Sequence, residues 1–263
     1  MHSDAFDRYH HQQSALHRLD PRIKVVVSIA FILSNALLPD GAWMAFALAW
    51  LFLILANALS ELGLGFAFRR SFIALPFALV AVTVLFSIPG NPIFQFHFLM
   101  SNFTVTDAGL LRFVSIVIRS WLSVQMAILL VAVTRFPDLV HAFEHLRVPA
   151  ILTTIIAFLY RYLFVLTDEV IRLLRARQSR SAAVAGQRSG GNVWWRASVA
   201  GNMAGQLFLR SYERSDRIYN AMLARGYAGQ LRTLNPHELH GRDWAYAILA
   251  FLFILAMQFV GRY

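Results

Sequence analysis

Six runs of apolar residues dominate the chain, and each is close to the length that a membrane-crossing helix requires. They occupy residues 23–38, 42–59, 72–88, 113–134, 148–166 and 244–260. A helix needs roughly 20 residues to cross about 30 Å of hydrocarbon, and 58% of the 263 residues are hydrophobic. The sequence therefore predicts an all-α integral membrane protein.

Basic residues set the expected orientation, because short loops rich in Lys and Arg stay in the cytoplasm. Residues 172–232 contain eleven Arg and only two acids, and Arg18, Arg22 and Lys24 lie at the start of the first run. Both segments are expected to be cytoplasmic, so an even number of crossings separates them. The run 148–166 carries Arg161 at its centre, which costs roughly 2.5 to 3.5 kcal/mol on insertion. We therefore place this run at the cytoplasmic interface and expect about five transmembrane helices.

This orientation divides the chain into four parts. They are a cytoplasmic N-terminal segment (1–22), a membrane domain of four spans (23–134), a cytoplasmic coupling module (135–243), and a C-terminal span and tail (244–263). Within the membrane domain, Pro76 predicts a kink in the third run. Alternating aromatic residues at 94–98 predict a hairpin, and Thr106 or Asp107 is expected to cap the helix that follows.

The coupling module carries two amphipathic patterns with helical spacing. One apolar seam is Leu159, Leu163, Leu166, Val170 and Leu173, and the other is Phe208, Tyr212, Ser215, Tyr219 and Met222. Such seams are typical of helices that pack along one face. Small residues permit helices to approach closely, so we expect the two helices to cross at Ala197, Gly201, Ala204 and Gly205.

An arginine lies near the expected C-terminal end of each helix. The first is in Ala176-Arg177-Gln178 and the second in Ala224-Arg225-Gly226. The helix dipole favours a cation at that end, and Gly226 is expected to form a left-handed cap.

Four motifs resemble one family of membrane proteins. They are HRLDPRIK, RFPDLVHAFEHLRVP, RLLRARQ and SYERSDRIYNAMLARGYAG, and they are similar to the transmembrane T component (EcfT) of energy-coupling factor transporters, in its cobalt/nickel, CbiQ-type branch. The resemblance implies a subunit of the bacterial cytoplasmic membrane that joins two ABC-type ATPases to a substrate-binding, CbiM/NikM-like membrane subunit, with a small accessory membrane subunit as a further expected partner.

The same resemblance implies the roles of the arginine motifs. Ala176, Arg177 and Gln178, and likewise Ala224, Arg225 and Gly226, would dock into grooves on the two ATPases. The first motif departs from the Ala-Arg-Gly form at Gln178. No catalytic residue, cofactor or bound metal is expected in this chain, because no phosphate-binding loop occurs and ATP hydrolysis belongs to the partners.

Two other functions compete with this interpretation. His141, Glu144 and His145 match the H-x-x-E-H pattern of a zinc protease, which leaves an interfacial metalloprotease as an alternative. The structural interpretation of the same segment is a short amphipathic helix with both histidines on its polar face. The sequence pI of about 10.8 also suits nucleic acid, but no binding motif accompanies the arginines, so no nucleic-acid partner is expected.

Overall fold

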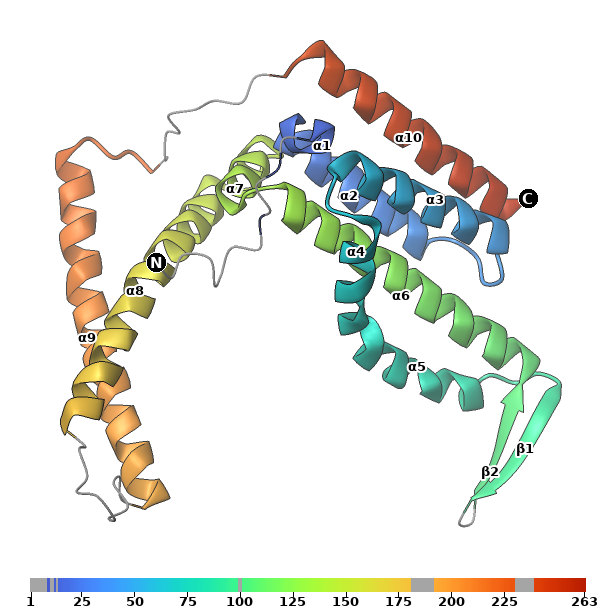
Figure 1. Cartoon of the computed structure of the whole chain (residues 1–263), viewed down its shortest axis with the longest axis horizontal. Coiled ribbons are helices and arrows are strands. Elements are labelled where there is room, and N and C mark those ends of the chain that lie inside the picture. Colours follow the sequence, from blue (N-terminus) through green and yellow to red (C-terminus); the bar gives the residue numbers. More distant parts are fainter. Residues whose placement is uncertain (1–8, 10–11, 13, 99–100, 181–191, 230–238) are drawn as a thin grey trace. The chain divides into compact units, whose positions relative to one another are not determined.

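The computed structural model describes residues 9, 12, 14–98, 101–180, 192–229 and 239–263 (Figure 1). Residues 181–191 and much of the expected N-terminal segment 1–22 lie outside the described residues. Contacts divide the chain into two units. The larger unit joins Phe6–Ala142 to Pro236–Tyr263, and the smaller unit is centred on Phe143–Asn235.

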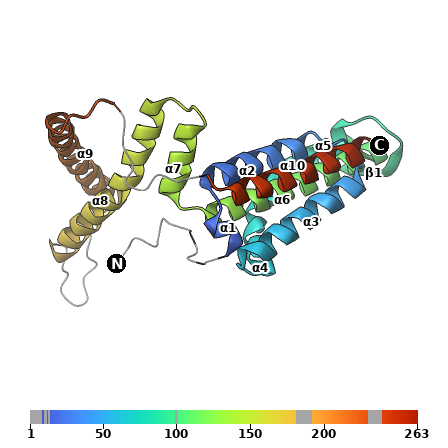
Figure 2. The ribbon, with the colours of Figure 1, turned by 90° about the horizontal axis from the view of Figure 1, so that it is seen from above.

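The larger unit is a bundle of four long helices. They are α2 (Pro21–Ala36), α3 (Trp43–Ser60), α6 (Asp107–Val133) and α10 (Gly241–Arg262), with the short α1 (Ala15–Arg18) at one end. Figure 2 shows the four long helices side by side. Each contributes a large side chain to the centre of the bundle, and each of these side chains is at most 1% exposed: Phe31, Leu53, Leu122 and Met257.

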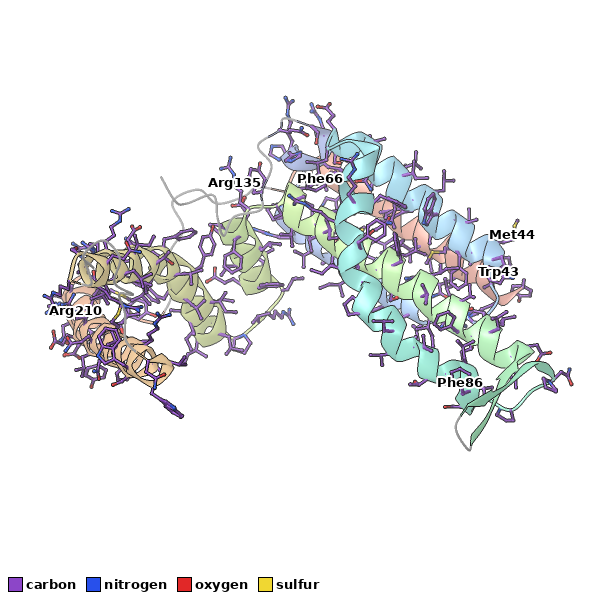
Figure 3. The ribbon with its side chains drawn as sticks, turned by 60° about the horizontal axis from the view of Figure 1, so that its bottom comes forward. Trp43, Met44, Phe66, Phe86, Arg135 and Arg210 are labelled. Carbon is purple, nitrogen blue, oxygen red and sulfur yellow. The ribbon has the colours of Figure 1, made fainter. Side chains whose placement is uncertain are left out.

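The outer surface of this bundle is apolar as well. Trp43, Met44 and Phe86 are 53%, 72% and 41% exposed, and Figure 3 shows their side chains on the outside of the larger unit. Large exposed apolar surfaces are rare on soluble monomers. Together with the apolar helices, this surface makes the chain a multi-pass membrane protein.

Local chemistry explains where the helices begin. Asp20 Oδ1 accepts a hydrogen bond from the Arg22 backbone N–H at 2.8 Å, and Pro21 occupies the first position of α2, which is the position where a proline fits a helix. Thr106 Oγ1 accepts from the Gly109 backbone N–H at 3.1 Å, so the predicted cap of α6 is confirmed.

The two irregular features predicted for the membrane domain are present. Strands β1 (Pro92–Phe98) and β2 (Ser101–Thr106) pair antiparallel, so the described residues include one hairpin among their helices. The helices α4 (Leu64–Arg70), η2 (Ser71–Ala74) and α5 (Leu75–Ser87) follow a bent path, with 61° between Gly65–Ala74 and Leu79–Ser87. Pro76 lies at this bend, in the first turn of α5, where a proline is tolerated because the backbone N–H that it lacks would have no partner within the helix.

Four described helices are long and apolar enough to cross a membrane, namely α3, α6, α10 and α8 (Ala150–Arg180), and the bent pair makes five if it forms one span. Two of our expected assignments differ from this set. Helix α2 has 16 residues, about 24 Å of helix, and falls short by length. Helix α8 passes by length and composition, and our placement of its apolar part at the interface stays a prediction.

Polar side chains also join the helices of the bundle. Asn35 Nδ2 of α2 donates to the Arg119 carbonyl and to Ser123 Oγ of α6, both at 2.9 Å. The Arg119 guanidinium is paired with Asp40 in the loop between α2 and α3. From the sequence alone, an arginine in this apolar run is explained by a side chain that extends to the membrane surface. The structure adds a counter-charge for it, the carboxylate of Asp40.

Candidate functional site

The smaller unit is built around two long helices, α8 (Ala150–Arg180) and α9 (Val193–Ala224). With 1.5 Å of rise per residue, each is about 46 to 48 Å long. The N-terminal part of α8 and the C-terminal end of α9 line the same groove, from Ile151 and Thr154 on one side to Met222 and Tyr227 on the other. The two helices are therefore antiparallel.

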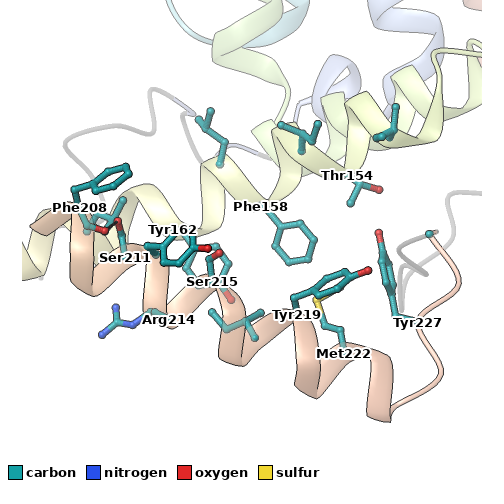
Figure 4. A pocket seen from close by; sticks show the side chains of 17 residues that line it. Thr154, Phe158, Tyr162, Phe208, Ser211, Arg214, Ser215, Tyr219, Met222 and Tyr227 are labelled. Atoms are coloured by element: carbon teal, nitrogen blue, oxygen red, sulfur yellow. Dashed lines mark hydrogen bonds between the residues drawn. The ribbon is translucent and has the colours of Figure 1, made fainter.

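An apolar groove of about 800 Å³ lies between these helices. Figure 4 shows Phe158 of α8 and Tyr219 of α9 at this space. The groove is lined by seven of the ten residues that form the two predicted seams, namely Leu159, Leu166, Phe208, Tyr212, Ser215, Tyr219 and Met222. Both seams thus face the same space, as their helical spacing indicates, but the helices do not close over it.

Glu169 connects the two helices beyond the apolar part of α8. Its Oε1 accepts from Arg210 of α9 at 2.6 Å, and its Oε2 accepts from Arg172 at 2.5 Å. The hydrogen bond from Arg210, helped by the charges of Arg172 and Arg214, lowers the pKa of Glu169. This contact was missed from the sequence because none of these residues belongs to an apolar seam.

The Arg225 motif forms the capped end of α9. The helix ends at Ala224, Arg225 is the C-cap, and Gly226 adopts φ +80°. The Gly226 N–H donates to the Leu223 carbonyl and the Tyr227 N–H to the Met222 carbonyl, both at 3.0 Å. This pair of bonds is a Schellman motif, so the predicted left-handed cap is present, and it leaves Arg225 exposed at the tip.

The Arg177 motif has a different local structure. Helix α8 continues to Arg180, so Ala176, Arg177 and Gln178 are all helical and lie in its last turns. Arg177 is half-buried, whereas Ala176 and Gln178 are exposed. Because α8 and α9 are antiparallel, Arg177 and Arg225 lie at opposite ends of the helix pair.

The close crossing that we predict at the small residues of α9 is not the one observed. Ala197, Gly201, Ala204 and Gly205 are exposed, and a Cβ atom built at Gly201 or Gly205 meets nothing within 4 Å. Small residues are found where helices touch and also where a surface is open, and the spacing alone does not distinguish these cases. In this structure the ion pair at Glu169 and the groove-lining residues join the helices instead.

The H-x-x-E-H segment lies in α7 (Phe136–His145). His141 is buried, so its predicted place on a polar face is wrong, while His145 is exposed. Glu144 Oε1 accepts from Thr153 Oγ1 at 3.3 Å. Among the described residues there is no group of three His, Cys, Asp or Glu side chains that could hold a metal ion, so the metalloprotease alternative gains no support.

Residues 12–236 match the sequence profile of the CbiQ family, which is described as a cobalt transport protein. The chain belongs to the CbiQ family. Several similar proteins are named energy-coupling factor transporter transmembrane protein EcfT. Those of Acidaminococcus fermentans and Lacticaseibacillus paracasei are both 27% identical, over 88% and 91% of this chain and 86% and 92% of the relatives.

The EcfT of Brevibacillus brevis is 26% identical over 96% of both chains. The similarity to these EcfT proteins therefore covers both structural units of this CbiQ family member. Membership makes it a membrane protein of a transport family.

Proposed function

We propose that this protein is the transmembrane coupling component of an energy-coupling factor importer in the bacterial cytoplasmic membrane. Its N-terminus is cytoplasmic, and the helix pair α8–α9 docks two ABC-type ATPases and transmits their ATP-driven motion to a substrate-binding membrane subunit. The family match across residues 12–236 and the names of the similar proteins support this role.

The observation that carries the proposal is the exposed Arg225 tip. A Schellman cap orders the last turn of α9 and leaves the guanidinium at its end. A second arginine, Arg177, occupies the last turn of α8 at the opposite end of the pair. Two separated cationic tips on one chain suit two similar partners, each with carboxylates that accept bidentate hydrogen bonds.

The proposed substrate is cobalt, or nickel as its closest chemical neighbour. This part rests on the family description alone. Uptake of radioactive cobalt, nickel and an organic vitamin by cells that express the complete transporter would distinguish these substrates. Vitamin uptake without metal uptake would remove the metal from the proposal and leave the coupling role in place.

Docking is tested by removing the arginines. Truncating one partner of a buried charge pair costs roughly 2 to 5 kcal/mol, so Arg225→Ala is expected to weaken one ATPase contact by about thirty-fold to several thousand-fold. Arg225→Lys should recover only part of this affinity, because an ammonium keeps the charge and loses the planar fork.

The double variant Arg177→Ala, Arg225→Ala should lose both ATPases during purification, because neither contact then supports the other. Arg196→Ala and Arg217→Ala are charge-matched controls on the same helix and should keep the complex. Recovery of both ATPases at the normal ratio by the double variant would refute docking at these residues.

A further inference from the structure

A second cavity, of about 270 Å³, lies between the helices of the membrane bundle, is open on one side, and is independent of the proposed coupling role. All four long helices line it, with residues such as Val27, Phe52, Met126 and Ala250. An engineered apolar cavity of roughly 150 Å³ in another protein stays dry and takes up benzene, so an apolar space of this size is suited to an apolar guest.

The cavity opens toward the surface that faces lipid. Leu55 and Leu59 of α3 and Leu249 of α10 belong to its lining, and they are 48%, 48% and 66% exposed. A guest therefore reaches the cavity from the side of the bundle, between two helices that are each long enough to cross the membrane. The acyl chain of a membrane lipid is the apolar molecule available at this position.

Polar groups lie at one end of the cavity. Lys24 lines it, and its Nζ donates to the His17 carbonyl at 3.1 Å and to the Val133 carbonyl, in the last turn of α6, at 3.4 Å. An ammonium has three donors. Thr134 also lines the cavity, and its buried hydroxyl, only 3% exposed as a residue, has no hydrogen-bond partner among the described residues.

The charges around Lys24 restrict the lipid head group. Asp20, Asp138 and Asp243 interact electrostatically with Lys24. Asp20 Oδ1 also lies 3.9 Å from Arg22 Nε, whereas Asp20 Oδ2 is buried without a partner in the described part of the chain, so three carboxylates face two cations here. A lipid with a net negative head group would meet these carboxylates. A head group that carries both a phosphate and an ammonium matches both signs.

We propose that this cavity binds one phosphatidylethanolamine molecule, with an acyl chain among the apolar residues and its ester or phosphate oxygens at Lys24 and Thr134. The ammonium of the lipid faces the carboxylates. The lipid completes the packing of α2, α3, α6 and α10 at the end of the bundle where α6 finishes.

Native mass spectrometry of the full chain in mild detergent tests the site. Ala56→Phe and Ala250→Phe fill the cavity and should reduce the lipid-bound fraction at least ten-fold, while Ala47→Phe, on the exposed face of α3, should leave it unchanged. Thr134→Val keeps the shape of the side chain and should reduce lipid retention several-fold. If the hydroxyl does not bind lipid, Thr134→Val retains lipid normally, and that result counts against the site.

Head-group selectivity is measured by loading the delipidated protein from equimolar phosphatidylethanolamine and phosphatidylglycerol. At least five-fold enrichment of phosphatidylethanolamine is expected. Equal retention of the two lipids would overturn the charge argument, and equal lipid retention by both phenylalanine variants and by Ala47→Phe would overturn the site itself. A partner subunit that co-purifies in place of lipid and is lost on filling the cavity would assign the cavity to a protein helix.

Discussion

At the scale of single residues, Gly226 shows how one backbone conformation sets the position of a functional side chain. Its φ of +80° belongs to the left-handed region, which costs other residues roughly 1 to 2 kcal/mol. Gly226→Ala is therefore expected to destabilise the end of α9 by about that amount and to loosen Arg225. Hydrogen exchange of the last turn of α9 measures this effect.

Gly201→Ala is the matched control for that change. Gly201 is an interior residue of the same helix, with open space around it, so added alanine should stabilise α9 by roughly 0.5 to 1 kcal/mol. The same substitution is thus expected to act with opposite signs at two positions of one helix. Increased protection of the last turn in Gly226→Ala would contradict the cap as described.

Asp40 and Arg119 form the other residue-scale feature with a measurable effect. Their side chains are 33% and 19% exposed. This exposure is intermediate between that of surface ion pairs, which contribute little to stability, and that of buried ion pairs, which are costly to break. Asp40→Asn should lower the free energy of unfolding of the bundle by about 1 to 3 kcal/mol. In a protein that already carries Arg119→Met, Asp40→Asn should have little further effect, because the ion pair is already lost. Arg112→Met, which changes a 58% exposed partner at 3.8 Å, should cost less than about 1 kcal/mol. A double-mutant cycle in the melting of the purified protein checks the coupling.

At the scale of elements, Glu169 makes the pairing of α8 with α9 depend on pH. Its pKa is lowered in the folded protein, chiefly by the Arg210 hydrogen bond. The ionised carboxylate therefore stabilises the helix pair above the unfolded pKa of about 4.3, and this stabilisation is lost as the pH falls through the folded pKa. Hydrogen exchange along α9 should show weaker protection on acidification. Glu169→Gln should remove this pH dependence, whereas Glu213→Gln, on the exposed side of α9, should retain it.

The elements also show what the sequence could and could not predict. The four-and-three spacing within each apolar seam, one containing Leu159 and the other Tyr219, identified the helix faces that border the groove, because helical periodicity is a local property. The contact at Glu169 depends on the register between α8 and α9, because its partner Arg210 lies 41 residues further along the chain, and no local pattern contains that register. For the same reason, the small residue at Gly201 showed only that another helix could approach closely there. It did not show that a helix lies there.

At the scale of the whole molecule, α8 decides which side of the membrane the arginine tips face. Its apolar part is long enough to cross, whereas Arg161 and the eleven arginines of residues 172–232 favour a cytoplasmic interface. If α2 crosses and α8 does not, both tips face the cytoplasm and α10 carries the C-terminus outward. If α2 and α8 both cross, α9 and both tips face outward and the C-terminus faces the cytoplasm.

Single cysteines separate these two arrangements, because the chain has no cysteine of its own. Asn202→Cys lies on an exposed part of α9, and Tyr263→Cys replaces a residue that is 96% exposed. We expect a membrane-impermeant thiol reagent to label Tyr263→Cys on intact cells and Asn202→Cys only after permeabilisation. The reverse pattern would mean that an odd number of helices cross the membrane before α9, and Arg177 and Arg225 could not then reach ATPases in the cytoplasm. Because both variants keep both arginines, this result depends on the path of the chain and not on the strength of any docking contact.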